Sequence, residues 1–431
     1  MAELPATLLE LRAAISGRRI SVAEALAAQF ARIDPINASS HCVVNALPRP
    51  ETTRAGPLAG IALAHKDIFS LQSRAPGCGV HGGREDAASR PAVVIAALQQ
   101  AGAAQSATLV MAPLACGATG ENANSAQRVI NPMDAAAAVG GSSSGSAVAV
   151  AAGLCYVSMG TDTAGSVRIP AATCGVIGLK TTAGLLGTEG VMPLSPSLDT
   201  VGLLARSAAD AAAVLRVLAP QLREAPGDAH WAPRLGARLS IKSLDDEVAG
   251  ALSAFCEAIG LAPGADEQGE IAAHAELTRL ADTLLHVEAS RLHRGGLQQQ
   301  DLPDGARAVA LPGVAIPDAW HNAAKAARAQ HARDFAARYF NDSDILLVPA
   351  LPEALPDWDA VDTRSTGFAP RRLLALHRFM GFVNYLGFPA LVLPVAQDRR
   401  GRPICMQALA RPFHEHTLLR FALDFTHART R

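Results

Sequence analysis

The sequence carries little charge and few aromatic side chains. Charged residues make up 18% of the 431 residues and aromatic residues 4%, and 38 Lys and Arg nearly balance 39 Asp and Glu. The resulting net charge of −1 argues against a nucleic-acid-binding surface and against a polybasic patch for acidic membranes. Apolar residues, at 49%, instead predict a compact chain with a large core and argue against disorder.

Three other patterns are missing from the sequence. It has no Cys-x-x-Cys pair, no run of eighteen apolar residues without polar interruption, and no basic-then-apolar start typical of a signal peptide. Its seven cysteines are scattered among apolar neighbours, which is typical of reduced core residues in a reducing compartment. We therefore expect a cytoplasmic protein without a membrane span.

Two stretches rich in glycine and serine stand at the centre of the sequence. Residues 140–146 precede a predicted helix at 147–153 and a predicted strand at 154–159; residues 162–170 turn tightly again before the next helix. Backbone without side-chain bulk can turn its N–H groups toward one point, and a helix N-terminus adds a positive dipole. We therefore expect a site that stabilises negative charge, either on a bound anion or on an oxyanion. The alternative is a flexible linker, for which an Asp-x-x-Gly-Ser-x-Arg-x-Pro pattern serves no purpose.

Other segments alternate between strand and helix patterns. Strands are predicted at 61–67, 107–112, 344–349 and 388–394, and helices at 6–34 (two), 92–103, 207–218 and 417–425, with a capping box at Ser21 and Glu24. Residues 222–340 are more polar and mainly helical. The alternation predicts an α/β fold with a large, mostly parallel β-sheet.

Serine and lysine are the candidate chemical groups. Ser142 and Ser166 lie 24 residues apart in the two loops, and Lys66 ends a predicted strand. A serine hydroxyl is a poor nucleophile until a base removes its proton. Histidine is the usual base, but none lies between His81 and His230. A lysine that burial keeps neutral can serve instead, and Ser-Lys variants of the catalytic triad exist.

Several weaker patterns favour structural explanations. Ser143 fits the Gly-x-Ser-x-Gly nucleophile elbow, but no triad acid or histidine follows nearby, so we expect a supporting hydrogen-bond role for it. The glycine-rich loop lacks the Gly-Lys-Ser/Thr of a phosphate-binding loop. The sequence from His414 to His416 lacks metal-ligand spacing on a helix face, and Cys174 is expected in the core.

On these residues the chain resembles the amidase signature family. The matching segments are residues 65–67, 120–122, 140–147, 162–171, 174–180, 197–202, Asn384 and 387–390. The resemblance thins over about 222–340. It implies Ser166 as nucleophile, Ser142 as bridging serine after a cis peptide bond, and Lys66 as base, a Ser-Ser-Lys triad. It further implies an oxyanion hole formed by the backbone N–H groups of Thr163, Ala164, Gly165 and Ser166, with Ser143, Asp162 and Arg168 supporting the site.

The family's chemistry is amide hydrolysis through an acyl-enzyme, with no cofactor and no metal. One alternative is the glutaminase subunit of a tRNA-dependent amidotransferase. Val110 and Pro113 depart from the Thr-Asn-Met-x-Glu run of that branch, and its acidic residue for the glutamine amino group falls near His377 here, so the chain lacks that carboxylate. A non-catalytic binding protein on the same fold is the second alternative, and the three intact catalytic positions argue against it.

The resemblance also implies an amidase-signature fold, a large mixed, mostly parallel β-sheet covered by helices on both faces, as a single domain spanning 1–431. Its expected parts are N-terminal helices at 1–55, a catalytic core at 56–220, a variable helical cap at 222–340 and further core elements at 341–431. We expect the acyl pocket to draw on residues 110–120, 188–198 and 222–340. The expected partner is a small-molecule amide, with neither nucleic acid nor membrane; a homodimer stays open, since homodimers are common among soluble enzymes.

Overall fold

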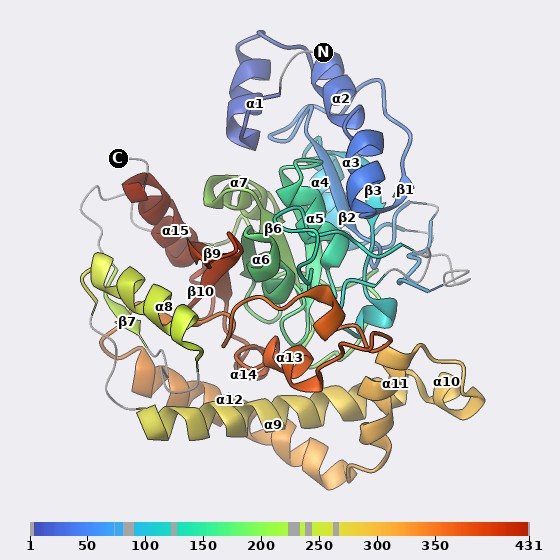
Figure 1. Ribbon diagram of the computed structural model, residues 1–431. Coiled ribbons are helices and arrows are strands. Elements are labelled where there is room, and N and C mark those ends of the chain that lie inside the picture. The colour runs from blue at the N-terminus through green and yellow to red at the C-terminus, as the bar shows by residue number, and fades with distance from the viewer. Residues whose placement is uncertain are drawn as a thin grey trace.

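The computed structural model describes residues 4–72, 74–80, 90–121, 127–222, 233–237, 244–261 and 267–429 (Figure 1). Asn122, in one of the matching segments, lies outside them. The strands are β1 (Val43–Ala46), β2 (Ala62–Lys66), β3 (Ala104–Leu109), β4 (Val157–Asp162), β5 (Ile177–Lys180), β6 (Thr200–Ala205), β7 (Leu235–Ala237), β8 (Ile345–Pro349), β9 (Ala390–Gln397) and β10 (Pro403–Ala410).

The α-helices are α1 (Leu8–Ser16), α2 (Val22–Phe30), α3 (Ile33–Ser40), α4 (Val93–Gln100), α5 (Ser144–Ala151), α6 (Arg168–Cys174), α7 (Ala208–Leu218), α8 (Asp246–Ala258), α9 (Glu267–Leu292), α10 (Arg294–Gln299), α11 (Asp304–Ala310), α12 (Asp318–Tyr339), α13 (Pro370–Ala375), α14 (Gly381–Leu386) and α15 (Glu415–Arg429). Short 3-10 turns are η1 (Pro113–Ala115), η3 (Leu311–Val314) and η4 (Trp358–Ala360). In the view of Figure 1, α1–α3 lie at the top and α9 and α12 along the bottom, with the strands between them.

A seven-stranded sheet in the order β4-β6-β5-β9-β10-β8-β7 forms the centre of the molecule. The predicted α/β class and mixed sheet are confirmed, but the expected predominance of parallel pairs is wrong. In this sheet only β7 and β8 pair in parallel among the described strands, and the other neighbours are antiparallel. Between β9 and β10 the cause is visible, because the chain reverses in a tight turn where the Gly401 N–H donates to the Asp398 carbonyl. So short a connection can join only antiparallel strands.

A second sheet, in the order β1-β3-β2, carries the candidate lysine. Strand β2 pairs in parallel with β3, and Lys66 at its end stands opposite Leu109. Every residue of β2 is buried, and the strand packs against β4 of the large sheet. The lysine is therefore held where the two sheets meet.

The helices begin and end for local reasons. The predicted capping box at Ser21 and Glu24 is present, and Thr7 and Glu10 form a second one. The two helices predicted within 6–34 are α1 and α2, and a third helix, α3, follows them. Helix α5 begins at Ser144, three residues before the predicted start, and lies close to β3. A Cβ at Gly145 would stand 2.6 Å from the Val110 backbone nitrogen, so only glycine permits this approach.

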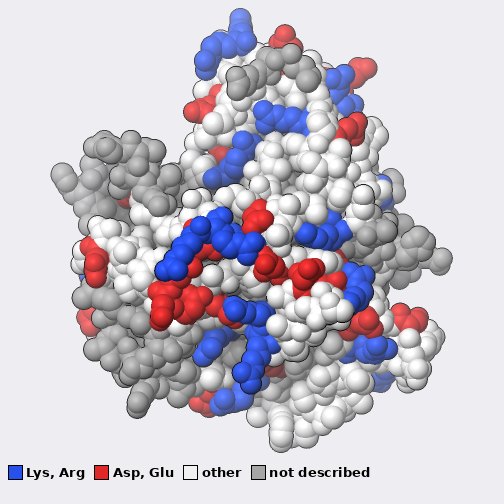
Figure 2. Space-filling model, in the orientation of Figure 1, with Lys and Arg blue, Asp and Glu red and all other residues white. Residues whose placement is uncertain are grey.

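The described part of the region 222–340 is mainly helical and also contains β7 at the edge of the large sheet. One apolar core contains residues from α1 through α15. On the face drawn in Figure 2, acidic and basic side chains are interleaved. Among the described residues, no helix combines the length and apolar character needed to cross a membrane.

Candidate active site

Lys66 is buried, with 1% of its surface exposed. Its Nζ lies 2.7 Å from the Ser142 Oγ and 2.8 Å from the Thr161 Oγ1. Burial lowers the pKa of Lys66 to about 7, although the carboxylates of Asp199 and Asp162 act in the opposite direction. Near neutral pH a large fraction of this amine is therefore uncharged and able to accept a proton.

The two serine loops lie side by side in front of two helices. The Gly141–Ser142 peptide bond is cis, and Ser142 is two residues before α5. Ser166 is two residues before α6 and is 8% exposed, whereas Ser142 is fully buried. The Ser143 N–H donates to the Ser166 carbonyl at 3.1 Å, which joins the loops directly. The structure thus brings the predicted lysine and bridging serine into contact and places Ser166 in the adjoining loop.

Asp162 holds the loop that carries Ser166. Its carboxylate accepts hydrogen bonds from the N–H groups of Gly165, Val167 and Arg168, and from the Arg168 guanidinium at 2.8 Å. Burial alone would raise the pKa of Asp162, but the charge of Arg168 and these hydrogen bonds hold it well below its usual range. The fully buried Arg168 also donates to Gln407 at 2.7 Å and to Asn384 at 2.5 Å. Asp162 and Arg168 therefore both make hydrogen bonds at the loop that carries Ser166, and their supporting role stays a prediction.

Three of the four predicted oxyanion donors are available. The Gly165 N–H donates to Asp162 at 2.9 Å, so the structure contradicts its assignment as an oxyanion donor. No protein acceptor is found among the described residues for the N–H groups of Thr163, Ala164 and Ser166. Gly165 has a φ of +109°, and a Cβ there would lie 2.7 Å from the Met380 Cγ. Glycine is needed at this position for conformation and space rather than for a free donor.

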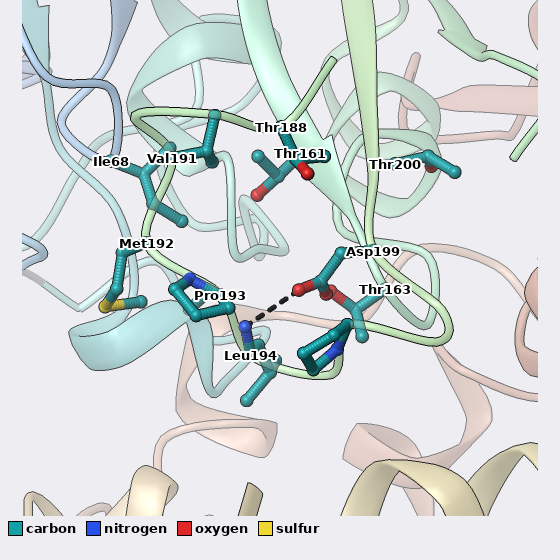
Figure 3. A pocket seen from close by; sticks show the side chains of 12 residues that line it. Ile68, Thr161, Thr163, Thr188, Val191, Met192, Pro193, Leu194, Asp199 and Thr200 are labelled. Carbon is teal, nitrogen blue, oxygen red and sulfur yellow. Dashed lines mark hydrogen bonds between the residues drawn. The ribbon is translucent and has the colours of Figure 1, made fainter. Parts of the chain in front are cut away.

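A pocket of about 250 Å³ lies beside this loop (Figure 3). Its walls are mostly apolar and hydroxyl side chains, lined by Ile68, Ala115, Thr161, Thr163, Thr188, Val191, Met192, Pro193, Leu194, Pro196, Asp199 and Thr200. Two of the three expected segments contribute, 110–120 and 188–198, and none of the described residues of 222–340 lines the pocket. Thr161 and Thr163 connect the pocket to Lys66 and to the loop that carries Ser166.

Asp199 is the charged side chain of this pocket. It accepts hydrogen bonds from the Thr163 Oγ1 at 2.6 Å and from the Leu194 N–H at 2.9 Å, the contact drawn in Figure 3. Burial raises the pKa of Asp199 to about 6. Both carboxylate oxygens are thus occupied in bracing the pocket wall, since the Ser195 N–H also donates to each of them.

Sequence reasoning missed two partners of the site. Thr161 directly precedes Asp162 on the buried strand β4, which leads into the loop that carries Ser166. A hydroxyl at that place in the sequence could have indicated a contact with the site. Gln407 is 239 residues from Arg168, and no local pattern indicates that contact. Ser143 donates its N–H to the Ser166 carbonyl and its hydroxyl to the Thr161 carbonyl at 3.4 Å, and its supporting role stays a prediction.

Comparisons with known proteins identify relatives of this chain. A family model described as Amidase matches residues 28–266 and 312–419. A Glutamyl-tRNA(Gln) amidotransferase subunit from Methylococcus capsulatus is 29% identical over 98% of this chain and 96% of its own length. The Putative amidase AmiD of Mycobacterium bovis is 30% identical over 85% of this chain and 79% of its own.

Other comparisons cover different shares of the chains. The corresponding Glutamyl-tRNA(Gln) amidotransferase subunit from Aromatoleum aromaticum is 38% identical over 50% of this chain, and the match spans about half of that relative, 46%. A crystal structure of an amidase superposes with a TM-score of 0.85 and 26% identity, over 98% of this chain and 99% of the other. The family match covers well over half of the sequence, and the resemblance read from the two loops is confirmed: this chain belongs to the Amidase family.

Proposed function

We propose that this chain is an amidohydrolase that cleaves a carboxylic amide through an acyl-enzyme on Ser166. The observation that carries the proposal is the contact of the buried Lys66 Nζ with the Ser142 Oγ, at 2.7 Å. A lysine with a pKa near 7 has the protonation state that a general base requires. The amidase relatives and the family match support the same reaction class.

In this mechanism Lys66 accepts the proton of Ser142, Ser142 accepts that of Ser166, and the Ser166 Oγ attacks the amide carbonyl. The oxyanion that forms is stabilised by the N–H groups of Thr163, Ala164 and Ser166, each worth about 3 kcal/mol in the transition state. The proton returns through Ser142 to the leaving nitrogen, the C–N bond breaks, and the amine departs. Water, deprotonated by the same relay, then cleaves the ester and restores Ser166.

We infer that the substrate has a small, uncharged acyl group. The pocket of about 250 Å³ has apolar and hydroxyl walls, and its carboxylate, Asp199, is already saturated by protein donors. Among the described residues no Lys or Arg lines it, so they offer no partner for a substrate carboxylate. Aryl and short aliphatic amides match these walls better than amino-acid amides.

A second candidate is the glutaminase subunit of a transferase complex. The end-to-end match to the amidotransferase protein of Methylococcus capsulatus favours it. The position expected for the glutamine-binding acid carries His377, which contacts the Ala164 carbonyl at 3.1 Å instead. Release of ammonia from glutamine only with partner subunits would support this role, and full activity of the isolated chain on neutral amides would contradict it.

We further propose that the whole chain is one domain located in the cytoplasm. The core that joins α1 to α15 supports the first point. All seven cysteines are buried and free of disulfides, as expected in a reducing compartment.

The test compares the native enzyme with Ser166→Ala on a panel of aryl amides, short aliphatic amides and glutamine. A fluorophosphonate probe, with the modified residue identified by mass spectrometry, reports on the nucleophile independently of substrate choice. We expect labelling at Ser166 and loss of both labelling and turnover in the variant. Unchanged turnover in Ser166→Ala rejects the nucleophile assignment. A native enzyme that neither labels nor turns over any amide supports a non-catalytic binding role.

A further inference from the structure

A buried glutamate outside the catalytic loops holds one wall of the pocket. Glu288 belongs to α9 and is separated from Ser195 by 93 residues of sequence. Its Oε2 accepts hydrogen bonds from the Ser195 hydroxyl at 2.7 Å and from the Ser197 N–H at 2.9 Å. Its Oε1 lies 3.1 Å from the Nε2 of His321 on α12. Three groups therefore converge on one carboxylate, and two of them belong to the segment that contains the pocket wall.

That segment connects directly to the loop that carries the proposed nucleophile Ser166 (residues 163–167, the nucleophile loop). Leu194 and Pro196 line the pocket on either side of Ser195. The Ser195 N–H donates to Asp199 at 3.1 Å, and Asp199 accepts the Thr163 hydroxyl at 2.6 Å. A continuous hydrogen-bonded path thus leads from α9 to the loop that carries Ser166, and it fixes the distance between that loop and the wall.

Helix α12 provides a second anchor for the same segment. Arg328 donates to the Ser197 carbonyl and, at 2.9 Å, to the Asn384 carbonyl. The Asn384 side chain in turn donates to Asp162 at 3.0 Å. The wall is therefore attached to two helices of the 222–340 region, although no side chain from the described part of that region lines the pocket.

We propose that Glu288 is a positioning residue that sets the acyl-group specificity of this enzyme by holding residues 194–197 against the pocket. The inference rests on the proposed amide hydrolysis for its kinetic consequence and on the contacts alone for its structural one. Glu288 touches neither the pocket space nor the proposed reacting atoms, so it acts through Ser195 and Ser197. Burial alone would raise the pKa of Glu288, but the hydrogen bonds from Ser197, Ser195 and His321 lower it.

The site offers a matched pair of substitutions. Glu288→Ala removes all three contacts. Glu288→Gln keeps one amide oxygen for Ser195 and Ser197, and its NH₂ group can donate to the His321 Nε2 when the Nδ1 of that ring carries the proton. Glu276→Ala is the control, because it removes the same side chain from an exposed position of the same helix.

The first experiment measures amide hydrogen exchange in residues 194–199 of the full-length protein. We expect exchange at Ser197 to accelerate about tenfold or more in Glu288→Ala, because a hydrogen bond to a charged acceptor is lost. Exchange in Glu288→Gln and Glu276→Ala should stay near the native rate. An unchanged rate in Glu288→Ala overturns the proposal whether or not the protein hydrolyses amides.

The second experiment separates binding from chemistry. For a neutral amide that fills the pocket, Glu288→Ala should raise KM about tenfold with kcat nearly unchanged, since the wall contacts the acyl group in ground and transition states alike. Labelling of Ser166 by a small fluorophosphonate should stay within about threefold of native, because Asp162 still holds the nucleophile loop. In Glu288→Gln, KM for the same amide should stay near the native value.

Equal losses of kcat, labelling and thermal stability in Glu288→Ala and Glu288→Gln would show a general structural role and overturn the proposal. Accelerated exchange in Glu288→Ala, together with a native protein that turns over no amide, would instead reject the proposed function while keeping the coupling of α9 to the wall.

Discussion

The Thr161 hydroxyl lies 2.8 Å from the Lys66 Nζ, on the strand that leads into the nucleophile loop. A neutral lysine amine has two hydrogens and one lone pair. When one hydrogen is donated to Thr161, the lone pair can turn toward the hydroxyl of Ser142, 2.7 Å away. Thr161 therefore orients the proposed base rather than taking part in the proton transfer itself.

Replacing Thr161 by valine keeps the shape of the side chain and removes the acceptor. We expect kcat/KM to fall about tenfold to a hundredfold, because an oriented hydrogen bond to the base is lost. Thr161→Ser keeps the hydroxyl and should stay near the native value. Similar losses in both variants would indicate that the methyl group, and not the hydroxyl, is what the site requires.

The pH dependence of acylation follows from the burial of Lys66. Since its pKa is lowered to about 7, the protonated form predominates below that pH and cannot accept a proton from Ser142. The rate of Ser166 labelling should therefore rise about tenfold per pH unit up to about pH 7 and then level off. Fluorophosphonate labelling between pH 5 and 9 measures this, and a flat profile, or one that falls as pH rises, would contradict the role of Lys66.

Removing the charge of Asp162 should unfold the site. In Asp162→Asn, Arg168 stays fully buried without its counter-ion, which costs about 3–5 kcal/mol in the free energy of unfolding. Urea unfolding measures the loss. The matched control is Asp424→Asn, whose exposed pair with Arg420 contributes about 0.5 kcal/mol or less. A change at Asp162 as small as the control would mean that Arg168 finds other acceptors.

A methyl group at Gly165 should displace the nucleophile loop. In Gly165→Ala the new Cβ meets Met380 at a positive φ, and we expect Ser166 labelling to slow about a hundredfold, as for a shift of about 1 Å in a reacting group. Gly184→Ala is the control, because that residue also has a positive φ but a Cβ there meets nothing within 4 Å. Equal effects of the two substitutions would assign the loss to backbone strain alone.

The catalytic candidates were predictable from the sequence, whereas their surroundings were only partly so. Ser142, Ser166 and Asp162 stand in compact local patterns, and the family resemblance adds Lys66. Glu288 reaches the site through contacts between residues about ninety positions apart, which depend on how α9 folds back against the loop. No local pattern carries that information.

Strand direction failed for a different reason. The strands β8 and β9 were predicted from their apolar runs, but buried strands are equally apolar in either direction. Direction follows from the connections, and β10, which enforces the reversal after β9, was not predicted. Strands β5, β6 and β7 of the same sheet were not predicted either, so the apolar runs left most of its neighbouring pairs undetermined.

The short strand β7 makes the 222–340 region inseparable from the rest of the molecule. It covers the outer side of β8, from Ile345 to Leu347, and closes that border of the large sheet. A chain trimmed to remove this region would leave the backbone N–H and C=O groups of β8 open to pairing with other molecules. Shortened versions of this enzyme should therefore self-associate through that border, even when every group around Ser166 is intact.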